Sequence, residues 1–214
     1  MDFRNGQELL TLCEQENMTI SEVMKTREVT CTALSMEDVD QKLQTVLSIM
    51  KDAVRAPMMN PKRSIGGLIG GEAKKVSELG QTNTSICGSL LNKAISYSMA
   101  VLEVNASMGL IVAAPTAGSS GVLPGVLLAL QEDKQLDDDP IYAGLLNASA
   151  VGYLLMRNAS VSGAEAGCQA EVGAASAMAA SAVVEIMGGT PQMCLQAASI
   201  ALSNLLGMVC DPIA

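Results

Sequence analysis

Three stretches of the chain combine glycines, small hydroxyl residues and a reactive side chain: residues 62–75, 115–125 and 160–171. The middle stretch places two or three hydroxyls and a flexible backbone at the start of a predicted helix. Backbone amides and hydroxyls in such a place can hold an anion, for example a carboxylate or a phosphate. A tight turn whose glycines only let helices pack closely explains the same residues, so both interpretations remain open.

Two of the six cysteines lie in loops at the ends of predicted helices. Cys168 comes just before a helix, where the helix N-terminus favours a thiolate. Cys210 follows the last helix, which Pro212 prevents from continuing. The remaining cysteines fall within helical patterns or, in one case, in a connection, and we expect all of them to be buried as small apolar side chains. They are Cys13, Cys31, Cys87 and Cys194.

The composition excludes several classes of chemistry. The chain has no histidine, so it cannot build a Ser-His-Asp or Cys-His site, and any metal must be bound by thiolates or carboxylates. The 13 basic and 22 acidic side chains leave a net charge of −9, which makes nucleic acid an unsuitable partner. Residues 1–5 do not begin an apolar signal segment, and we expect a reducing, cytoplasmic location.

The pattern of apolar residues predicts an all-α fold. Apolar residues make up 49% of the chain but aromatic ones only 2%, so the core must form by close approach of small side chains. Helix starts are predicted at Ser35 and at Thr190, and a helix end at Pro57. We expect six or seven helices, at most one short strand at residues 111–114, and a single compact domain over residues 1–214 whose small-residue-rich helices are joined by Gly/Ser-rich active-site loops.

Two apolar segments could be mistaken for membrane spans. Residues 141–156 contain Asn147 and Ser149, and residues 172–187 contain Glu185. These polar side chains would make membrane insertion weak. We therefore expect buried helices of a soluble protein and no membrane contact.

Several long motifs resemble the alpha subunit of bacterial iron–sulfur L-serine dehydratases, and the resemblance extends from about residue 57 onward. The motifs are residues 66–71 (GGLIGG), 103–109 (EVNASMG), 113–125 (AAPTAGSSGVLPG), 163–171 (GAEAGCQAE) and 210–212 (CDP).

The resemblance implies a helical lyase that dehydrates and deaminates L-serine to pyruvate and ammonia. It implies a 4Fe–4S cluster bound by three cysteines, two of which are Cys168 and Cys210, with an open iron acting as Lewis acid on the serine hydroxyl. It further implies that the middle glycine-rich stretch holds the substrate carboxylate or orients its amine. The residues concerned are Thr116, Gly118, Ser119, Ser120 and Gly121.

The chain departs from this family pattern at its C-terminal end. The third cluster cysteine of the family comes roughly ten residues beyond the one that matches Cys210, and the sequence stops at Ala214. We therefore expect this chain to be a fragment that cannot hold a complete cluster and is inactive by itself, while the full-length protein is an enzyme.

The base that removes the α-proton is left open by the sequence. Lys62, Lys74 or Lys75 could serve if burial lowered its pKa, and Ser64 could bind substrate. For any one of these lysines a solvated surface position is an alternative. The base could also come from a beta subunit, with which two-subunit members of the family pair, and we expect an oligomer.

Two rival interpretations remain. Pyridoxal phosphate also supports serine dehydration, and a Ser/Gly loop could hold its phosphate, but the enzymes that use it have alternating strands and helices, which this sequence lacks. A non-catalytic helical partner or assembly subunit is the other alternative. It predicts that mutation of Cys168 leaves the activity of the complex intact.

Overall fold

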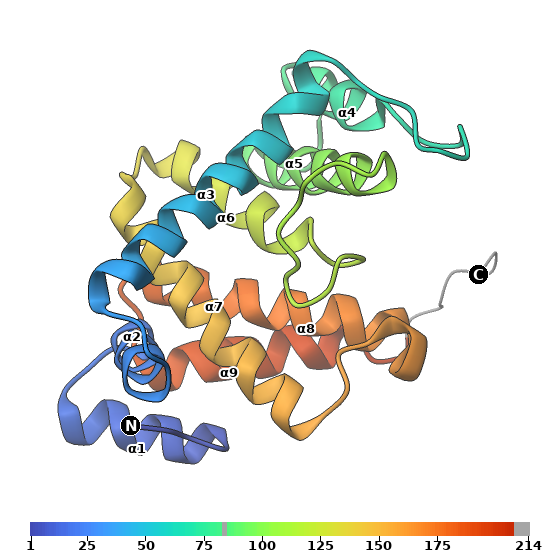
Figure 1. Cartoon of the computed structure of the whole chain (residues 1–214). Helices are drawn as coiled ribbons and strands as arrows, with labels where there is room; N and C mark the ends of the chain where they lie inside the picture. Colours follow the sequence, from blue (N-terminus) through green and yellow to red (C-terminus); the bar gives the residue numbers. More distant parts are fainter. Residues whose placement is uncertain (83–84, 208–214) are drawn as a thin grey trace. The chain divides into compact units, whose positions relative to one another are not determined.

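The computed structural model describes residues 1–82 and 85–207, and in these residues it contains nine α-helices and no strand (Figure 1). The predicted all-α class is confirmed. The helices are α1 (Gly6–Glu16), α2 (Ile20–Cys31), α3 (Met36–Met59), α4 (Glu72–Gly80), α5 (Gly88–Ala106), α6 (Val122–Lys134), α7 (Asp138–Asn158), α8 (Gly163–Ile186) and α9 (Pro191–Asn204). None of these described helices is both long and apolar enough to cross a membrane.

The helices gather into two compact units. The first contains residues 1–45 together with the chain from Asp138 onward, and the second contains residues 46–137. One border falls inside α3 and the other just before α7, so no linker composition marks either of them. This explains why the sequence shows no boundary between folding units.

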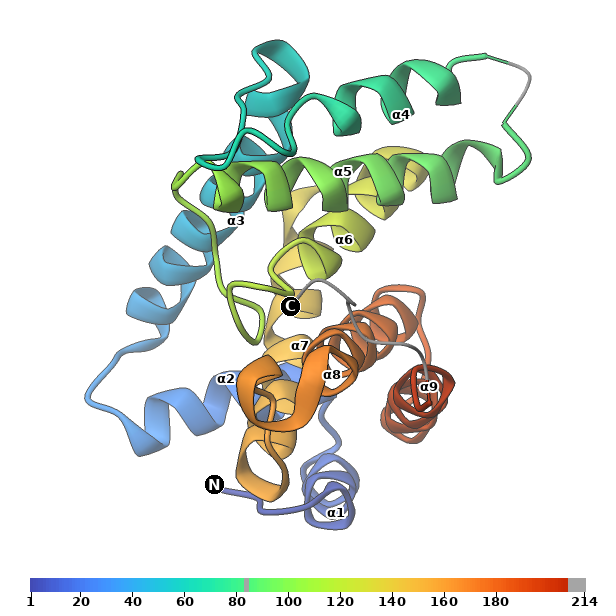
Figure 2. The same ribbon diagram turned by 90° about the vertical axis from the view of Figure 1, so that its right-hand side faces the viewer.

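In the first unit α8 packs against both α7 and α9, while α2 packs on α7. Its core is closed by the N-terminal residues, since Phe3 is completely buried. In the second unit α5 lies between α4 and α6, as Figure 2 shows. This central helix carries the candidate site at its C-terminal end.

The helix starts agree with the local signals of the sequence. Ser35 and Asp38 cap α3 reciprocally, because Asp38 N donates to Ser35 Oγ (3.1 Å) and Ser35 N donates to Asp38 Oδ2 (2.7 Å). Thr190 Oγ1 accepts from Met193 N (3.3 Å) and caps α9. The two capping predictions are thereby confirmed.

Two local predictions are wrong. Helix α3 continues past Pro57 to Met59, because the proline removes only its own N–H donor and the ladder resumes after it, with Asn60 N donating to Ala56 O (2.9 Å). The described residues form nine helices and not six or seven, and one of them, α4, begins at Glu72 within the glycine-rich stretch of residues 62–75 and continues beyond it to Gly80. The segment of residues 111–114 forms no strand, which agrees with the expectation of at most one.

Glycines allow α5 and α6 to cross at close range. A Cβ built at Gly121 would overlap the carbonyl oxygen of Ser98, and one built at Gly125 would overlap Ser98 Oγ. The Gly125 Cβ would also lie 2.8 Å from Ser98 N and 2.9 Å from Ala94 O. Because these are backbone atoms, they cannot rotate away. The predicted close approach of small side chains is observed at this crossing.

We expect Gly125→Ala to lower the free energy of unfolding by about 1–3 kcal/mol, the usual cost of overpacking a close contact. Gly66→Ala is the matched control, since a Cβ at Gly66 meets nothing within 4 Å. It should change stability by less than about 0.5 kcal/mol. Urea unfolding followed by circular dichroism measures both; equal losses in the two variants would contradict the packing argument.

Candidate functional site

The C-terminal end of α5 holds a buried carboxylate. Glu103 is 5% exposed, and its two oxygens accept separate hydrogen bonds, Oε2 from Gly71 N (2.9 Å) and Oε1 from Ala73 N (2.8 Å). Gly71 is the N-cap residue of α4, has no side chain and adopts a φ of 99°. Glu103 therefore caps α4 in place of a local side chain, and its negative charge lies where the helix dipole favours it.

The glycine-rich loop before α4 closes on Ser64. Ser64 N donates to Ile69 O (2.8 Å), and Ser64 Oγ accepts from Ile69 N (3.3 Å). At Gly70, with a φ of 143°, a Cβ would overlap the carbonyl oxygen of Lys62, so only glycine fits. The loop is joined to α5 where Ile65 N donates to Ala106 O (3.4 Å).

The loop of residues 115–121 is attached to the same end of α5. Asn105 Nδ2 donates to Ala117 O (3.1 Å). Inside the loop, Thr116 Oγ1 and Ser119 Oγ lie 3.1 Å apart, and Ser119 Oγ donates to Ala114 O (3.2 Å). One end of α5 thus brings together two of the three stretches that the sequence singles out.

Ser120 differs from the other hydroxyls of this loop. It is completely buried, and its Oγ has no hydrogen-bond partner among the described residues. The next residue, Gly121, is the N-cap of α6 and offers no side chain to the first amides of that helix. A buried hydroxyl without a partner beside an uncapped helix start is suited to a small anionic group.

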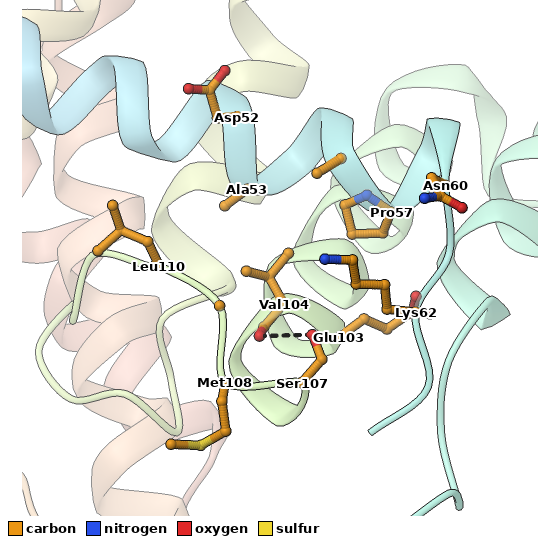
Figure 3. Close-up of a pocket in the computed structure, with 12 residues that line it drawn as sticks. Asp52, Ala53, Pro57, Asn60, Lys62, Glu103, Val104, Ser107, Met108 and Leu110 are labelled. Carbon is orange, nitrogen blue, oxygen red and sulfur yellow. Dashed lines mark hydrogen bonds between the residues drawn. The ribbon is translucent and has the colours of Figure 1, made fainter. Parts of the chain in front are cut away.

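A cavity of about 320 Å³ lies between the end of α3, Lys62 and the end of α5 (Figure 3). Its walls include Pro57, Glu103 and Ser107, and Ser107 Oγ donates to Val104 O (3.1 Å). Figure 3 shows the ammonium of Lys62 turned toward Val104 inside this cavity. The cavity is large enough for a small amino acid and has a cation at its wall.

The predicted site residues are distributed unevenly around this cavity. Lys62 lines it, whereas Lys74 and Lys75 lie on α4 and Ser64 closes the loop before that helix. The loop residues from Thr116 to Gly121 are not part of its wall either. Of the three candidate lysines, Lys62 is the one that lines this cavity, although the residue as a whole is exposed, as is Lys75, while Lys74 is half-buried.

Cys168 belongs to the first unit and follows a break in α8. Gly167 has φ 82° and ψ 164°, which are not helical, so that a short first turn is separated from the long remainder of the helix beginning at Cys168. A Cβ at Gly167 would meet nothing within 4 Å, and the Cys168 side chain is half-buried. A thiol at a helix start beside open space has the surroundings that favour a thiolate ligand.

Cys210, the other predicted cluster ligand, lies outside the described residues. In residues 1–82 and 85–207 no three cysteine, aspartate or glutamate side chains gather closely enough to hold a metal ion. The chemistry of Cys168 fits a cluster ligand. A complete ligand set is not visible in the described part of the chain.

The other cysteines are of two kinds. Cys13 and Cys194 are buried, as predicted, and burial together with the nearby charge of Glu185 raises the pKa of each thiol to about 11. The expected burial of Cys31 and Cys87 is wrong. Cys31 is the last residue of α2 and Cys87 precedes α5, and at these helix ends neither contributes to the core.

Sequence reasoning assigned no role to Glu103 and Asn105, although both lie in a quoted motif. The sequence does contain a feature that could have indicated a buried, hydrogen-bonded carboxylate here. Glu103 is the only acidic residue of α5 and has small and apolar neighbours. A single carboxylate on a largely apolar helix is rarely buried without a partner.

The chain is similar to known proteins over almost its whole length. A family model described as serine dehydratase alpha chain matches residues 15–214. A Bacillus subtilis protein named probable L-serine dehydratase, alpha chain, is 43% identical over 212 residues, covering 99% of this chain and 70% of that protein. The L-serine dehydratase alpha chain of Peptoniphilus asaccharolyticus is 40% identical over 212 residues, covering 99% and 73%.

A third relative is longer. The L-serine dehydratase of Streptomyces coelicolor is 36% identical over 218 residues, and the match covers 99% of this chain but 46% of that protein. The region represented by this chain therefore occurs both in proteins named alpha chain and within a chain about twice as long.

We expect thiol reagents at pH 8 to modify Cys31 and Cys87 in the folded protein but not Cys13 and Cys194. The raised pKa of Cys13 and Cys194 also makes the free energy of unfolding depend on pH. In the unfolded chain these thiols ionise near pH 9, whereas in the folded chain they stay protonated to about pH 11. Stability is therefore lost as the pH rises from 9 to 11, by up to ~1.4 kcal/mol per pH unit for each thiol. Mass spectrometry of alkylated peptides measures the labelling; modification of Cys194 at the rate of Cys31 would contradict the assigned burial.

Proposed function

Because the chain belongs to the serine dehydratase alpha chain family, we propose that it forms the catalytic part of an L-serine ammonia-lyase. The reaction removes the α-proton and the β-hydroxyl of L-serine as water. The aminoacrylate so formed tautomerises to an imine, and water hydrolyses this imine to pyruvate and ammonia. The observation that carries the proposal is the family match over residues 15–214, and the cavity lined by Lys62 and the C-terminal end of α5 supports it.

Lys62 is the residue we propose for transfer of the α-proton. Its side chain enters the cavity, which neither Lys74 nor Lys75 lines. A lysine can take up the α-proton only as the neutral amine. Ser64, which joins the two ends of its loop, is proposed to contact the substrate and to keep Lys62 in place.

The loop of residues 115–121 is proposed to bind the substrate carboxylate. The unpartnered Ser120 hydroxyl and the start of α6 support this role. Thr116, Gly118, Ser119 and Gly121 would give this loop its shape, since the Ser119 hydroxyl already bonds within it. Binding of the carboxylate would restrict the orientation of the substrate.

Cys168 and Cys210 are proposed as ligands of a 4Fe–4S cluster. When bound, such a cluster offers an open iron that acts as Lewis acid toward a hydroxyl. The half-buried thiol of Cys168 at a helix start supports this assignment. We propose that these 214 residues supply two of the three cysteine ligands and are therefore inactive alone. We further propose that the complete enzyme works with a beta subunit, as an oligomer in the cytoplasm.

Anaerobic reconstitution with iron and sulfide tests this proposal. We expect a chain extended beyond Ala214 to turn brown and, with the beta subunit, to form pyruvate from serine, whereas residues 1–214 stay colourless. A colourless and inactive extended chain would exclude the iron–sulfur proposal. It would favour a non-catalytic helical subunit instead.

We expect Lys62→Met to lower kcat/KM of the assembled enzyme by about 10²-fold or more, in the range that a positioned proton-transfer group contributes. Lys74→Met and Lys75→Met are the matched controls on α4 and should reduce it by far less. Steady-state pyruvate formation measures all three. A larger loss in Lys74→Met than in Lys62→Met would transfer the role to Lys74.

Cys168→Ser should abolish both the visible absorption of the reconstituted extended chain and its activity, because serine does not replace a thiolate toward iron. Cys31→Ser and Cys87→Ser remove exposed thiols and should leave both readouts unchanged. Full activity of Cys168→Ser would contradict cluster ligation by this residue.

A further inference from the structure

Residues 103–109 join both site loops, yet the proposed function gives this segment no task. We propose that Glu103 and Asn105 are positioning residues: Glu103 holds the glycine-rich loop that follows Lys62, and Asn105 holds the hydroxyl loop of residues 115–121. The end of α5 thereby sets the distance between the two loops. The expected effects on kcat and KM rest on the proposed function. The attachment of the two loops to α5 does not depend on it.

The Glu103 anchor acts on residues far away in the sequence. Its oxygens accept from Gly71 N and Ala73 N, 32 and 30 residues earlier in the chain, while the neighbouring Gly70 N donates to the local carboxylate of Glu72 (2.6 Å). Each Glu103 oxygen serves a different amide. A glutamine in its place could accept only one of these bonds and would turn its amide group toward the other N–H.

The Asn105 anchor acts on the other side of the helix. Residues two apart in an α-helix point about 200° apart, so Glu103 and Asn105 face nearly opposite directions. Figure 2 agrees, since the cyan chain after α3 lies above this end of α5 and the light green chain after α5 lies below it. The side chain of Asn105 reaches Ala117 O at 3.1 Å.

The segment that carries both anchors has a well-defined end. Ser107 N donates to Glu103 O (3.0 Å) and Gly109 N to Val104 O (2.8 Å). A Cβ at Gly109 would lie 2.5 Å from Val104 Cγ1, so the turn leaves no room for a larger residue. Two anchors on such a rigid end can place two loops with little freedom between them.

The loops should respond separately. Gly70 lies directly against the carbonyl of Lys62, so a loosened glycine-rich loop displaces the proposed base. We therefore expect Glu103→Gln to lower kcat about tenfold or more with little change in KM. Asn105→Asp removes the donor to Ala117 O and should raise KM about tenfold with a smaller change in kcat, because it releases the loop proposed to hold the carboxylate.

Hydrogen exchange of residues 1–214 tests the attachment without any activity. Glu103→Gln should make the amides of Gly71 and Ala73 exchange about tenfold faster and leave residues 117–121 unchanged, and Asn105→Asp should do the reverse. The control for the first is Glu22→Gln, whose carboxylate accepts from Thr19 N (2.8 Å). Asn204→Ala, which loses a bond to Ile200 O (2.7 Å), is the control for the second. Neither control should affect these amides.

The outcomes separate the two proposals. Faster exchange confined to the loop that each variant should release would support the positioning role. If the assembled wild-type enzyme at the same time showed no serine dehydratase activity, the proposed function would be refuted while the positioning role stood. Equal exchange in both loops for either variant, or equal effects on kcat and KM, would overturn the positioning role. If Glu103→Gln does not fold, Glu103→Asp, which keeps the charge but shortens the side chain by one methylene, is measured in the same way.

Discussion

The candidate site depends on the burial of one charge, the carboxylate of Glu103. Burial of an ion is unfavourable unless hydrogen bonds replace its water, and here Gly71 and Ala73 supply one amide to each oxygen. This satisfies the charge and caps a helix that begins with glycine. Removal of either partner would leave a buried group unsatisfied, at a cost of about 1–3 kcal/mol or more. The position of α4, and with it the loop after Lys62, follows from this requirement.

The rest of the second unit is arranged by close packing of small residues. Where α6 crosses α5, Gly121 and Gly125 lie against the backbone of Ser98. The start of α6 is therefore held at a short distance from α5, and the hydroxyl loop that precedes it is held on the same helix by Asn105. With few aromatic side chains in the chain, such contacts take over the role that large core residues have in other proteins.

The candidate site could be predicted from the sequence only in part. Thr116, Ser120 and Cys168 could be proposed as candidates because glycines, hydroxyls and a thiol near a helix start form a local pattern. The roles of Glu103 and Asn105 could not be found in this way, because their partners are 12 to 32 residues distant. The exposure of Cys87 was also missed, since a helical pattern does not reveal where the helix begins.

By itself the sequence determined the helical class, the family motifs and the capped starts of α3 and α9, because capping bonds join residues only three positions apart. Only the tertiary structure decided which loops meet at α5, which lysine lines the cavity at its C-terminal end and that a division into units falls inside α3. These features depend on contacts between distant segments. For example, nothing in the sequence indicates that the carboxylate of Glu103 accepts hydrogen bonds from the amides of Gly71 and Ala73.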